Sequence, residues 1–190
     1  MWETQAMTSV IMGQGTPVTE EEFFALGETS RRIELFDGSL FVTPARTPQH
    51  QHISSELAFA LRTAARKAGL YVHEAVNVRL LPGRIPIPDV AVTEKINFKE
   101  LVIDAEAVRL ICEIVSPSNA SADKVLKMHY YAAAGIPWYL LVEQESATLH
   151  LYQLRGDHYV EHSVTRPGEV LHLEEPVTAD LVPEDLLPPD

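Results

Sequence analysis

Hydrophobic residues along this chain follow two spacings, and the first of them predicts β-strands. Residues 71–81 carry apolar, often β-branched residues at alternate positions, which is typical of a strand with one buried face. Residues 86–92 are predicted to form a second strand, whose start is stiffened by Pro86 and Pro88. The segments 108–115 and 138–142 are almost continuously apolar, as expected for central strands that are buried on both faces. These four segments are the predicted strands of the core.

The second spacing, and the residues that flank it, predict helices. Residues 50–68 repeat apolar side chains every three or four positions, and Gly69 follows as a helix end. Residues 121–134 end before Gly135 in the same way. Thr19 is followed by three glutamates and then by apolar residues, which indicates a capped start of a shorter helix.

Two further β segments are predicted by their turns. The segments 32–35 and 40–42 flank Asp37 and Gly38, a dipeptide that favours a tight hairpin turn. The tail from 148 to 173 has short apolar stretches of strand character, which predict an antiparallel meander near the C-terminus.

The order of these elements predicts the fold class. The strand at 108–115, the helix at 121–134 and the strand at 138–142 form a plausible βαβ unit. We therefore expect an α/β fold with a mixed sheet flanked by helices and an additional C-terminal β-meander. Residues 1–16 are expected to form a flexible arm, and residues 17–187 a single domain.

Composition limits the class of protein. The chain has 190 residues, of which 46% are hydrophobic and 22% charged. It has no apolar run near the roughly 18 residues of a membrane span and no signal-peptide layout at its start, so no membrane association is expected. Its single cysteine, Cys112, fits a reducing cytoplasm. A net charge of −12 argues against a protein that coats nucleic acid by electrostatic attraction.

Carboxylates in apolar surroundings are the candidates for chemistry. Asp89 lies where a strand begins, Glu113 lies within the run 108–115, and Glu34 lies between two apolar residues of the predicted hairpin. A buried ionised carboxylate is costly unless it is paired or binds a cation. A turn or strand-edge position for Asp89, and an ion pair to an arginine for Glu113, are the plainer alternatives.

One lysine follows these acids on the predicted helix. Lys127 is four residues after Asp123, so the two share a helix face and could simply pair. Alternatively, two acids and a lysine suit phosphodiester hydrolysis. Mg²⁺ prefers carboxylate and water oxygens, and Mn²⁺ is a possible substitute. A metal between Asp89 and Glu113 would polarise the phosphate and acidify a bound water, while Lys127 would assist that water.

The ordered motifs resemble those of the PD-(D/E)xK nuclease superfamily, and within it the Uma-two family of restriction-endonuclease-like proteins. The resemblance extends over residues 16–187, and six segments carry it: 33–38, 50–53, 87–90, 112–118, 123–127 and 131–139.

The resemblance implies a restriction-endonuclease-like fold and a site. Asp89 and Glu113 match the two metal-binding acids, and Glu34 matches the acid of the early helix–strand region. Val115 stands where the strand motif has its lysine, and in this family the lysine appears on the next helix, which points to Lys127. Helix geometry permits the move, because a lysine stem reaches about one helical turn. Lys124 is the weaker substitute.

Two histidines allow a different metal motif. His50, His52 and Glu56 have the spacing of the first cupin metal motif, but that motif requires a barrel strand, whereas this segment has helical periodicity. His50 at the helix start either faces the site and contacts a phosphate or lies in solvent.

Three function classes follow. The first is a Mg²⁺-dependent DNA endonuclease with Glu34, Asp89, Glu113 and Lys127 as catalytic residues. The second is a catalytically silent binding or regulatory module that keeps the nuclease fold, which the acidic net charge favours. The third is a metal-dependent hydrolase of another substrate. A homodimer is expected for the enzyme, since a dimer gathers scattered basic residues into one cleft: Arg62, Arg66, Lys67, Arg79 and Arg84.

Overall fold

The structure is a computed structural model that describes residues 16–27, 29, 31–43, 45–115 and 122–189. The flexible arm predicted for residues 1–16 falls almost wholly outside the described residues. The division of the chain into that arm and a single domain therefore stays a prediction.

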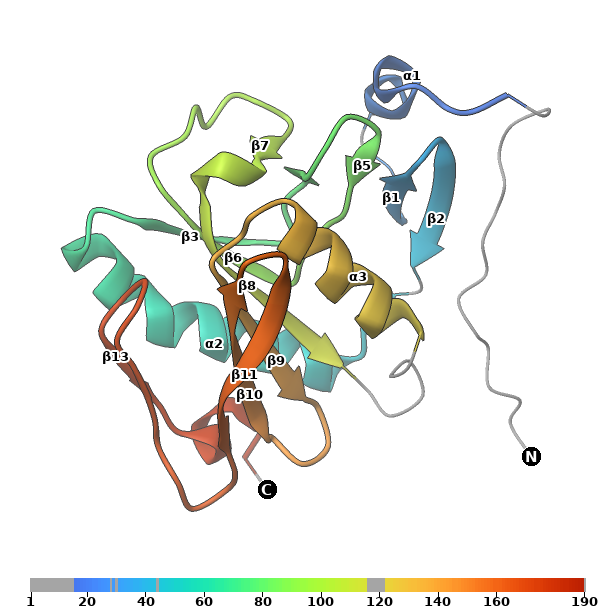
Figure 1. The fold of residues 1–190 in the computed structure, drawn as a ribbon. Helices are drawn as coiled ribbons and strands as arrows, with labels where there is room; N and C mark the ends of the chain where they lie inside the picture. The colour runs from blue at the N-terminus through green and yellow to red at the C-terminus, as the bar shows by residue number, and fades with distance from the viewer. Residues whose placement is uncertain (1–15, 28, 30, 44, 116–121, 190) are drawn as a thin grey trace, which may run out of the picture.

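A mixed sheet of six strands forms the centre of the molecule, as the sequence predicts (Figure 1). Its spatial order is β11-β10-β9-β8-β6-β3. Strands β8 and β9 run parallel, and every other neighbouring pair is antiparallel. The strand bounds are β3 Tyr71–Glu74, β6 Val90–Thr93, β8 Val108–Val115, β9 Trp138–Glu143, β10 Leu149–Arg155 and β11 His158–Thr165.

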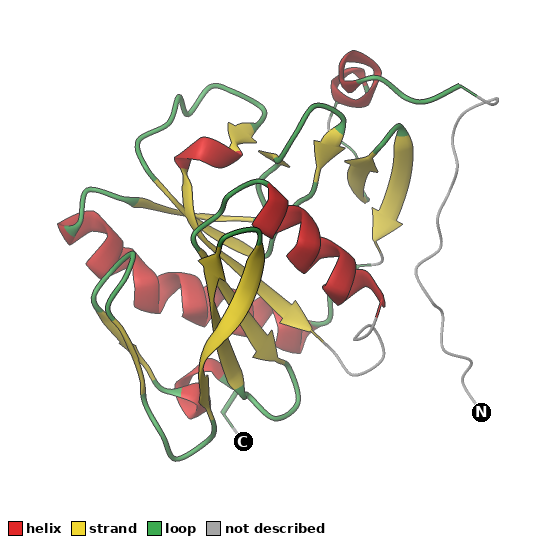
Figure 2. Cartoon of the chain, in the orientation of Figure 1, coloured by secondary structure: helices red, strands yellow, loops and turns green. Residues whose placement is uncertain are grey.

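Two long helices cover opposite faces of this sheet (Figure 2). Helix α2, Pro48–Lys67, begins two residues before the predicted start, because the Thr47 side chain caps it and Pro48 fits its first turn. Helix α3, Ala122–Ala133, connects β8 to β9 and completes the predicted βαβ unit. The short helix α1, Glu20–Ala25, has a capping box between Thr19 and Glu22, as its sequence predicts.

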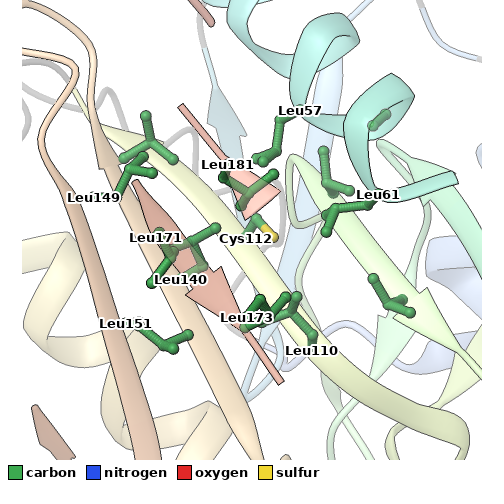
Figure 3. Close-up of a cluster of buried hydrophobic side chains, with 14 of the residues drawn as sticks. Leu57, Leu61, Leu110, Cys112, Leu140, Leu149, Leu151, Leu171, Leu173 and Leu181 are labelled. Carbon is green, nitrogen blue, oxygen red and sulfur yellow. The ribbon is translucent and has the colours of Figure 1, made fainter. Parts of the chain in front are cut away.

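The larger hydrophobic cluster fills the space between α2 and the sheet (Figure 3). Leu57 and Leu61 of α2 contact this cluster with Leu110 and Cys112 of β8, and all four are fully buried. Leucines from the C-terminal strands β12, Leu171–Leu173, and β13, Ala179–Leu181, complete it. Burial of this apolar surface anchors α2 and the chain end against one face of β8.

The second cluster lies under α3 on the other face. It includes Ile111 of β8 and Tyr131 of α3, both fully buried. Because side chains alternate along a strand, Glu113 shares the face of Ile111 and points toward α3 rather than toward α2. The sheet thus places this carboxylate under the helix that carries Lys127.

A small second sheet carries the predicted hairpin. Strands β1, Arg32–Phe36, and β2, Ser39–Thr43, pair antiparallel, and the short strand β5, Arg84–Ile85, pairs with β1. Asp37 and Gly38 both have positive φ, 50° and 80°, as a two-residue hairpin turn of the I′ type requires. This sheet brings Glu34 toward the core.

The expectation of one strand over residues 71–81 is wrong. Strand β3 ends at Glu74, and Ala75 has a φ of 51°, which turns the chain away from the sheet. The chain then forms β4, Val78–Arg79, which pairs in parallel with β7, Ile103–Asp104. Alternating apolar residues continue across this break because each piece turns one side chain toward a core: Val72 is half-buried against the first cluster, and Val78 is buried in the second.

The predicted strand over residues 86–92 is shorter than expected, and the predicted meander is divided. Strand β6 begins at Val90, so Pro88 and Asp89 precede it. Of the tail strands, β10 and β11 extend the main sheet as a hairpin, while β12 and β13 form a separate pair. Two 3₁₀ turns, Ala105–Ala107 and Pro183–Leu186, complete the elements named here. No helix in the described part of the chain is both long and apolar enough to cross a membrane.

Candidate active site

The four side chains that the sequence singles out converge in one buried cluster. Glu34 comes from β1, Asp89 from the residue before β6, Glu113 from β8 and Lys127 from α3. Their residues are 1%, 2%, 5% and 7% exposed, respectively. Burying four ionisable groups together is costly unless opposite charges and hydrogen bonds within the cluster offset the loss of water.

Asp89 is held by contacts to both of its oxygens. Its Oδ2 accepts a hydrogen bond from the backbone N–H of Ile114 at 2.9 Å and lies 3.1 Å from Nε2 of His50. Its Oδ1 accepts from Nη1 of Arg32 at 3.0 Å and from Nη2 of Arg46 at 3.1 Å. An ionised carboxylate has about four acceptor positions, so these four contacts occupy all the acceptor positions of Asp89.

These contacts keep Asp89 ionised. Burial by itself raises the pKa of the Asp89 carboxyl, but the hydrogen bond from His50 and the charges of Arg46 and Arg32 outweigh it and hold the pKa well below its usual range. The Arg32 guanidinium shows the reciprocal effect: burial lowers its pKa, but the nearby carboxylates of Asp89 and Glu113 raise it overall.

Glu34 is compensated by the lysine. Its Oε1 accepts hydrogen bonds from Nζ of Lys127 at 2.9 Å and from the backbone N–H of Ile87 at 2.8 Å. Burial raises the pKa of the Glu34 carboxyl, yet Lys127 and Arg32 have the larger combined effect and lower it. Glu34 is therefore an ionised partner of Lys127.

Glu113 has the weakest compensation. Its Oε1 accepts a hydrogen bond from the Tyr131 hydroxyl at 2.6 Å, and Nζ of Lys127 lies 3.8 Å away. Burial, reinforced by the negative charge of Asp89, raises the pKa of the Glu113 carboxyl to about 7, although Lys127 acts in the opposite direction. The arginine pair that the sequence allowed for Glu113 belongs instead to Asp89.

Lys127 reaches the cluster from the helix that follows β8, not from the strand itself. Val115 ends β8, and the lysine reaches the two glutamates from the next element, α3. The alternative pairing with Asp123, and the side chain of Lys124, lie outside the described side chains. Lys127 thus contacts Glu34 and Glu113 together, which local pairing on a helix would not require.

The contacts of Asp89 and Glu113 allow a test of fit to a divalent cation. Within the described residues, no three His, Cys, Asp or Glu side chains converge as a ready-made metal site. Mg²⁺, however, commonly uses only one or two carboxylates and completes its shell with water and substrate phosphate. The two acids fit such an ion in donor type. A cation at Oδ1 of Asp89 would have to replace a guanidinium there.

The two histidines have different positions. His50, in the first turn of α2, is 5% exposed and contacts Asp89, so it faces the cluster and not solvent; contact with a phosphate stays a prediction. His52 is half-buried two residues further along the helix. Residues two apart on a helix are rotated by about 200° around the helix axis and so lie on nearly opposite sides of it. The cupin-like metal motif therefore does not form.

Sequence reasoning missed three residues of this cluster: Arg32, Arg46 and Tyr131. Local signals were present for two of them. Arg32 lies two residues before Glu34 on the same face of β1, and Tyr131 lies four residues after Lys127 on the same face of α3. Arg46 precedes a helix cap, which gives no sign of a partner 43 residues away.

Comparisons with known proteins agree with this architecture. The family model described as "Uma2: Putative restriction endonuclease" matches residues 20–185. A solved structure, a "putative nuclease belonging to DUF820" from Anabaena variabilis, superposes with a TM-score of 0.72 at 17% sequence identity. The superposition covers 90% of this chain and 97% of that one, and it supports the restriction-endonuclease-like fold. A comparison with curated proteins gives no match.

Proposed function

Because the chain belongs to the Uma2 family of restriction-endonuclease-like proteins, we propose that it hydrolyses phosphodiester bonds in DNA with the help of a divalent cation. The single observation that carries the proposal is the contact of Lys127 with both Glu34 and Glu113, 2.9 and 3.8 Å from Nζ. These residues come from three separate elements, and Asp89 lies in the same cluster. Convergence of acids around one lysine suits phosphoryl chemistry better than it suits a structural ion pair.

Each side chain has a proposed role. Asp89 and Glu113 would hold the cation, for which Mg²⁺ is the first candidate and Mn²⁺ the second. When bound, such an ion supplies Lewis acidity toward the phosphate and lowers the pKa of a bound water. Lys127 orients the attacking water and places positive charge near the phosphoryl oxygens. Glu34 holds Lys127 in position through its 2.9 Å contact.

Tyr131 and the backbone supply the support for these groups. The hydroxyl of Tyr131 donates to Oε1 of Glu113, which fixes the rotamer of that carboxylate. The N–H of Ile114 does the same for Asp89, and the N–H of Ile87 for Glu34. Fixed donors of this kind keep the carboxylates in place without reorganisation during the reaction.

Nicking of a supercoiled plasmid tests the proposal. We expect nicking with Mg²⁺ or Mn²⁺, its loss in Glu113→Gln and Lys127→Met, and unchanged nicking in Lys99→Met, whose exposed side chain lies outside the cluster. Thermal unfolding of each variant identifies loss of fold. Nicking that persists in folded Glu113→Gln and Lys127→Met would overturn the assignment of these residues.

The charges of the cluster favour one alternative, a catalytically silent module. Three carboxylates (Glu34, Asp89 and Glu113) face three cations (Arg32, Arg46 and Lys127), so the described cluster is balanced by its own residues. A protein that only preserves the fold would keep this balance. Absence of nicking on DNA and RNA, together with no heat of metal binding in calorimetry, would favour the module.

The dimer remains part of the proposal, along with a cytoplasmic location suited to the single free cysteine. Of the basic residues that a dimer was expected to gather, Arg62, Arg79 and Arg84 form ion pairs with carboxylates of their own chain. A phosphate would have to compete with these partly exposed pairs, each of which is worth about 0–1 kcal/mol. Light scattering of the full chain measures the oligomeric state directly.

A further inference from the structure

The cations around Asp89 make fewer contacts than their burial would require. Six buried side-chain nitrogen or oxygen atoms of the described residues have no hydrogen-bond partner, and four of the six lie on the side chains that contact Asp89. They are Nε and Nη2 of Arg32, Nε of Arg46 and Nδ1 of His50. Three of these four atoms are guanidinium N–H donors, and a buried N–H without an acceptor is costly, so their concentration indicates that an acceptor belongs at this place.

The geometry of the two arginines supports this interpretation. A guanidinium usually grips a carboxylate with two parallel hydrogen bonds. Here Arg32 and Arg46 each give Asp89 one hydrogen bond, and both bonds go to the same oxygen, Oδ1. One carboxylate therefore does not use the donor capacity of two guanidinium groups.

The position of the arginines specifies the charge of the missing acceptor. Arg46 immediately precedes the cap of the 20-residue helix α2, whose first turn contains no acidic residue. The partial positive charge of a helix N-terminus adds to that of the arginines and favours an anion.

We propose that Arg32 and Arg46, with His50 beside them, form a clamp for a phosphate group of the DNA backbone. This inference rests on the proposed function for its ligand class. In the free protein the clamp neutralises Asp89. When DNA binds, the N–H groups of Arg32 and Arg46 that Asp89 leaves unused would donate to non-bridging phosphate oxygens.

Arg46→Gln is the variant that isolates the clamp. It removes one guanidinium but leaves Asp89 with Arg32, His50 and the N–H of Ile114, so we expect the variant to fold, which thermal unfolding checks. The matched control is Arg109→Gln. Like Arg46, Arg109 pairs with a single carboxylate, in its case that of Glu94. It lies four residues before Glu113, about 13 Å away along the same strand.

The measurement is binding of a short fluorescein-labelled DNA duplex in EDTA, where cleavage is prevented, followed by anisotropy over a series of salt concentrations. At low salt we expect Arg46→Gln to weaken binding about tenfold, as loss of a charged hydrogen bond does. The slope of log K against log salt should fall by about 0.9, the value for one lost phosphate contact. Arg46→Lys, which keeps the charge, should retain the slope, and Arg109→Gln should match the wild type.

Two outcomes would overturn the clamp, and plasmid nicking separates them. Equal affinity and salt slope in folded Arg46→Gln and Arg109→Gln, with a wild type that nicks plasmid, would refute the clamp and leave the nuclease assignment intact. A wild type that neither binds the duplex nor nicks plasmid would refute both.

Discussion

The buried ion pair of Lys127 and Glu34 allows a direct test of how much charge compensation in the cluster contributes to the free energy of unfolding. Lys127→Met removes the cation and leaves Glu34 with the backbone N–H of Ile87 and a weak contact to Thr43. At the observed 2.9 Å and an effective dielectric constant of about 20, the lost Coulomb attraction is about 6 kcal/mol. Part of that is offset because Lys127 no longer has to be desolvated.

The expected loss in the free energy of unfolding is therefore about 3–5 kcal/mol, the usual result of breaking a buried pair from one side. Glu34→Gln should cost less, because Lys127 keeps the carboxylate of Glu113 at 3.8 Å. The double variant Glu34→Gln/Lys127→Met removes both charges together. Its cost should be smaller than the sum of the two single costs by about 1–3 kcal/mol, a coupling typical of residues in direct contact. It should also be more stable than Lys127→Met, because residue 34 no longer carries a buried charge without its lysine.

Urea denaturation followed by circular dichroism gives all four free energies of the cycle. If the cost of the double variant equals the sum of the two single costs within about 0.5 kcal/mol, Lys127 and Glu34 do not stabilise each other and the proposed compensation is refuted. The double variant also separates stability from chemistry. Its fold should be restored relative to Lys127→Met while its nicking activity stays absent, since the proposed roles need the charges themselves.

Three further predictions concern other contacts. Tyr131→Phe removes the 2.6 Å hydrogen bond to Glu113 and should lower the free energy of unfolding by about 1–3 kcal/mol in urea; an unchanged value would show that the bond contributes nothing. Gly38→Ala should be more destabilising than Gly83→Ala. Both glycines have positive φ, 80° and 77°, which costs an L-residue about 1–2 kcal/mol, but only at Gly38 would the new Cβ meet Pro17; equal melting temperatures would contradict this. EDTA should abolish plasmid nicking and excess Mg²⁺ should restore it, whereas nicking in EDTA would exclude the proposed cation dependence.

Much of the fold could be predicted because the pattern that specifies it is local. The run 108–115 is apolar at nearly every position, and a strand buried between two helices is what that composition favours. Helix α2 repeats Leu57 and Leu61 on one face, and that face packs against the sheet. The exception is the segment 71–81, where the same alternation continues through the turn at Ala75.

The residue types of the site were also visible in the sequence. Asp89 and Glu113 stand out because they are acids in apolar surroundings, and burial makes such acids costly. Lys127 could be placed on a helix because Ser121 is a candidate cap and Gly135 with Pro137 ends the segment.

The partners of those residues were decided by tertiary structure alone. Asp89 contacts Arg32 across 57 residues of chain, and Lys127 contacts Glu34 across 93. Periodicity reports which side of an element is buried, because the spacing of side chains is set by the local backbone. Which buried charge faces which depends instead on how whole elements pack, so the sequence determined the elements and the acids, and only the packed fold decided their compensation.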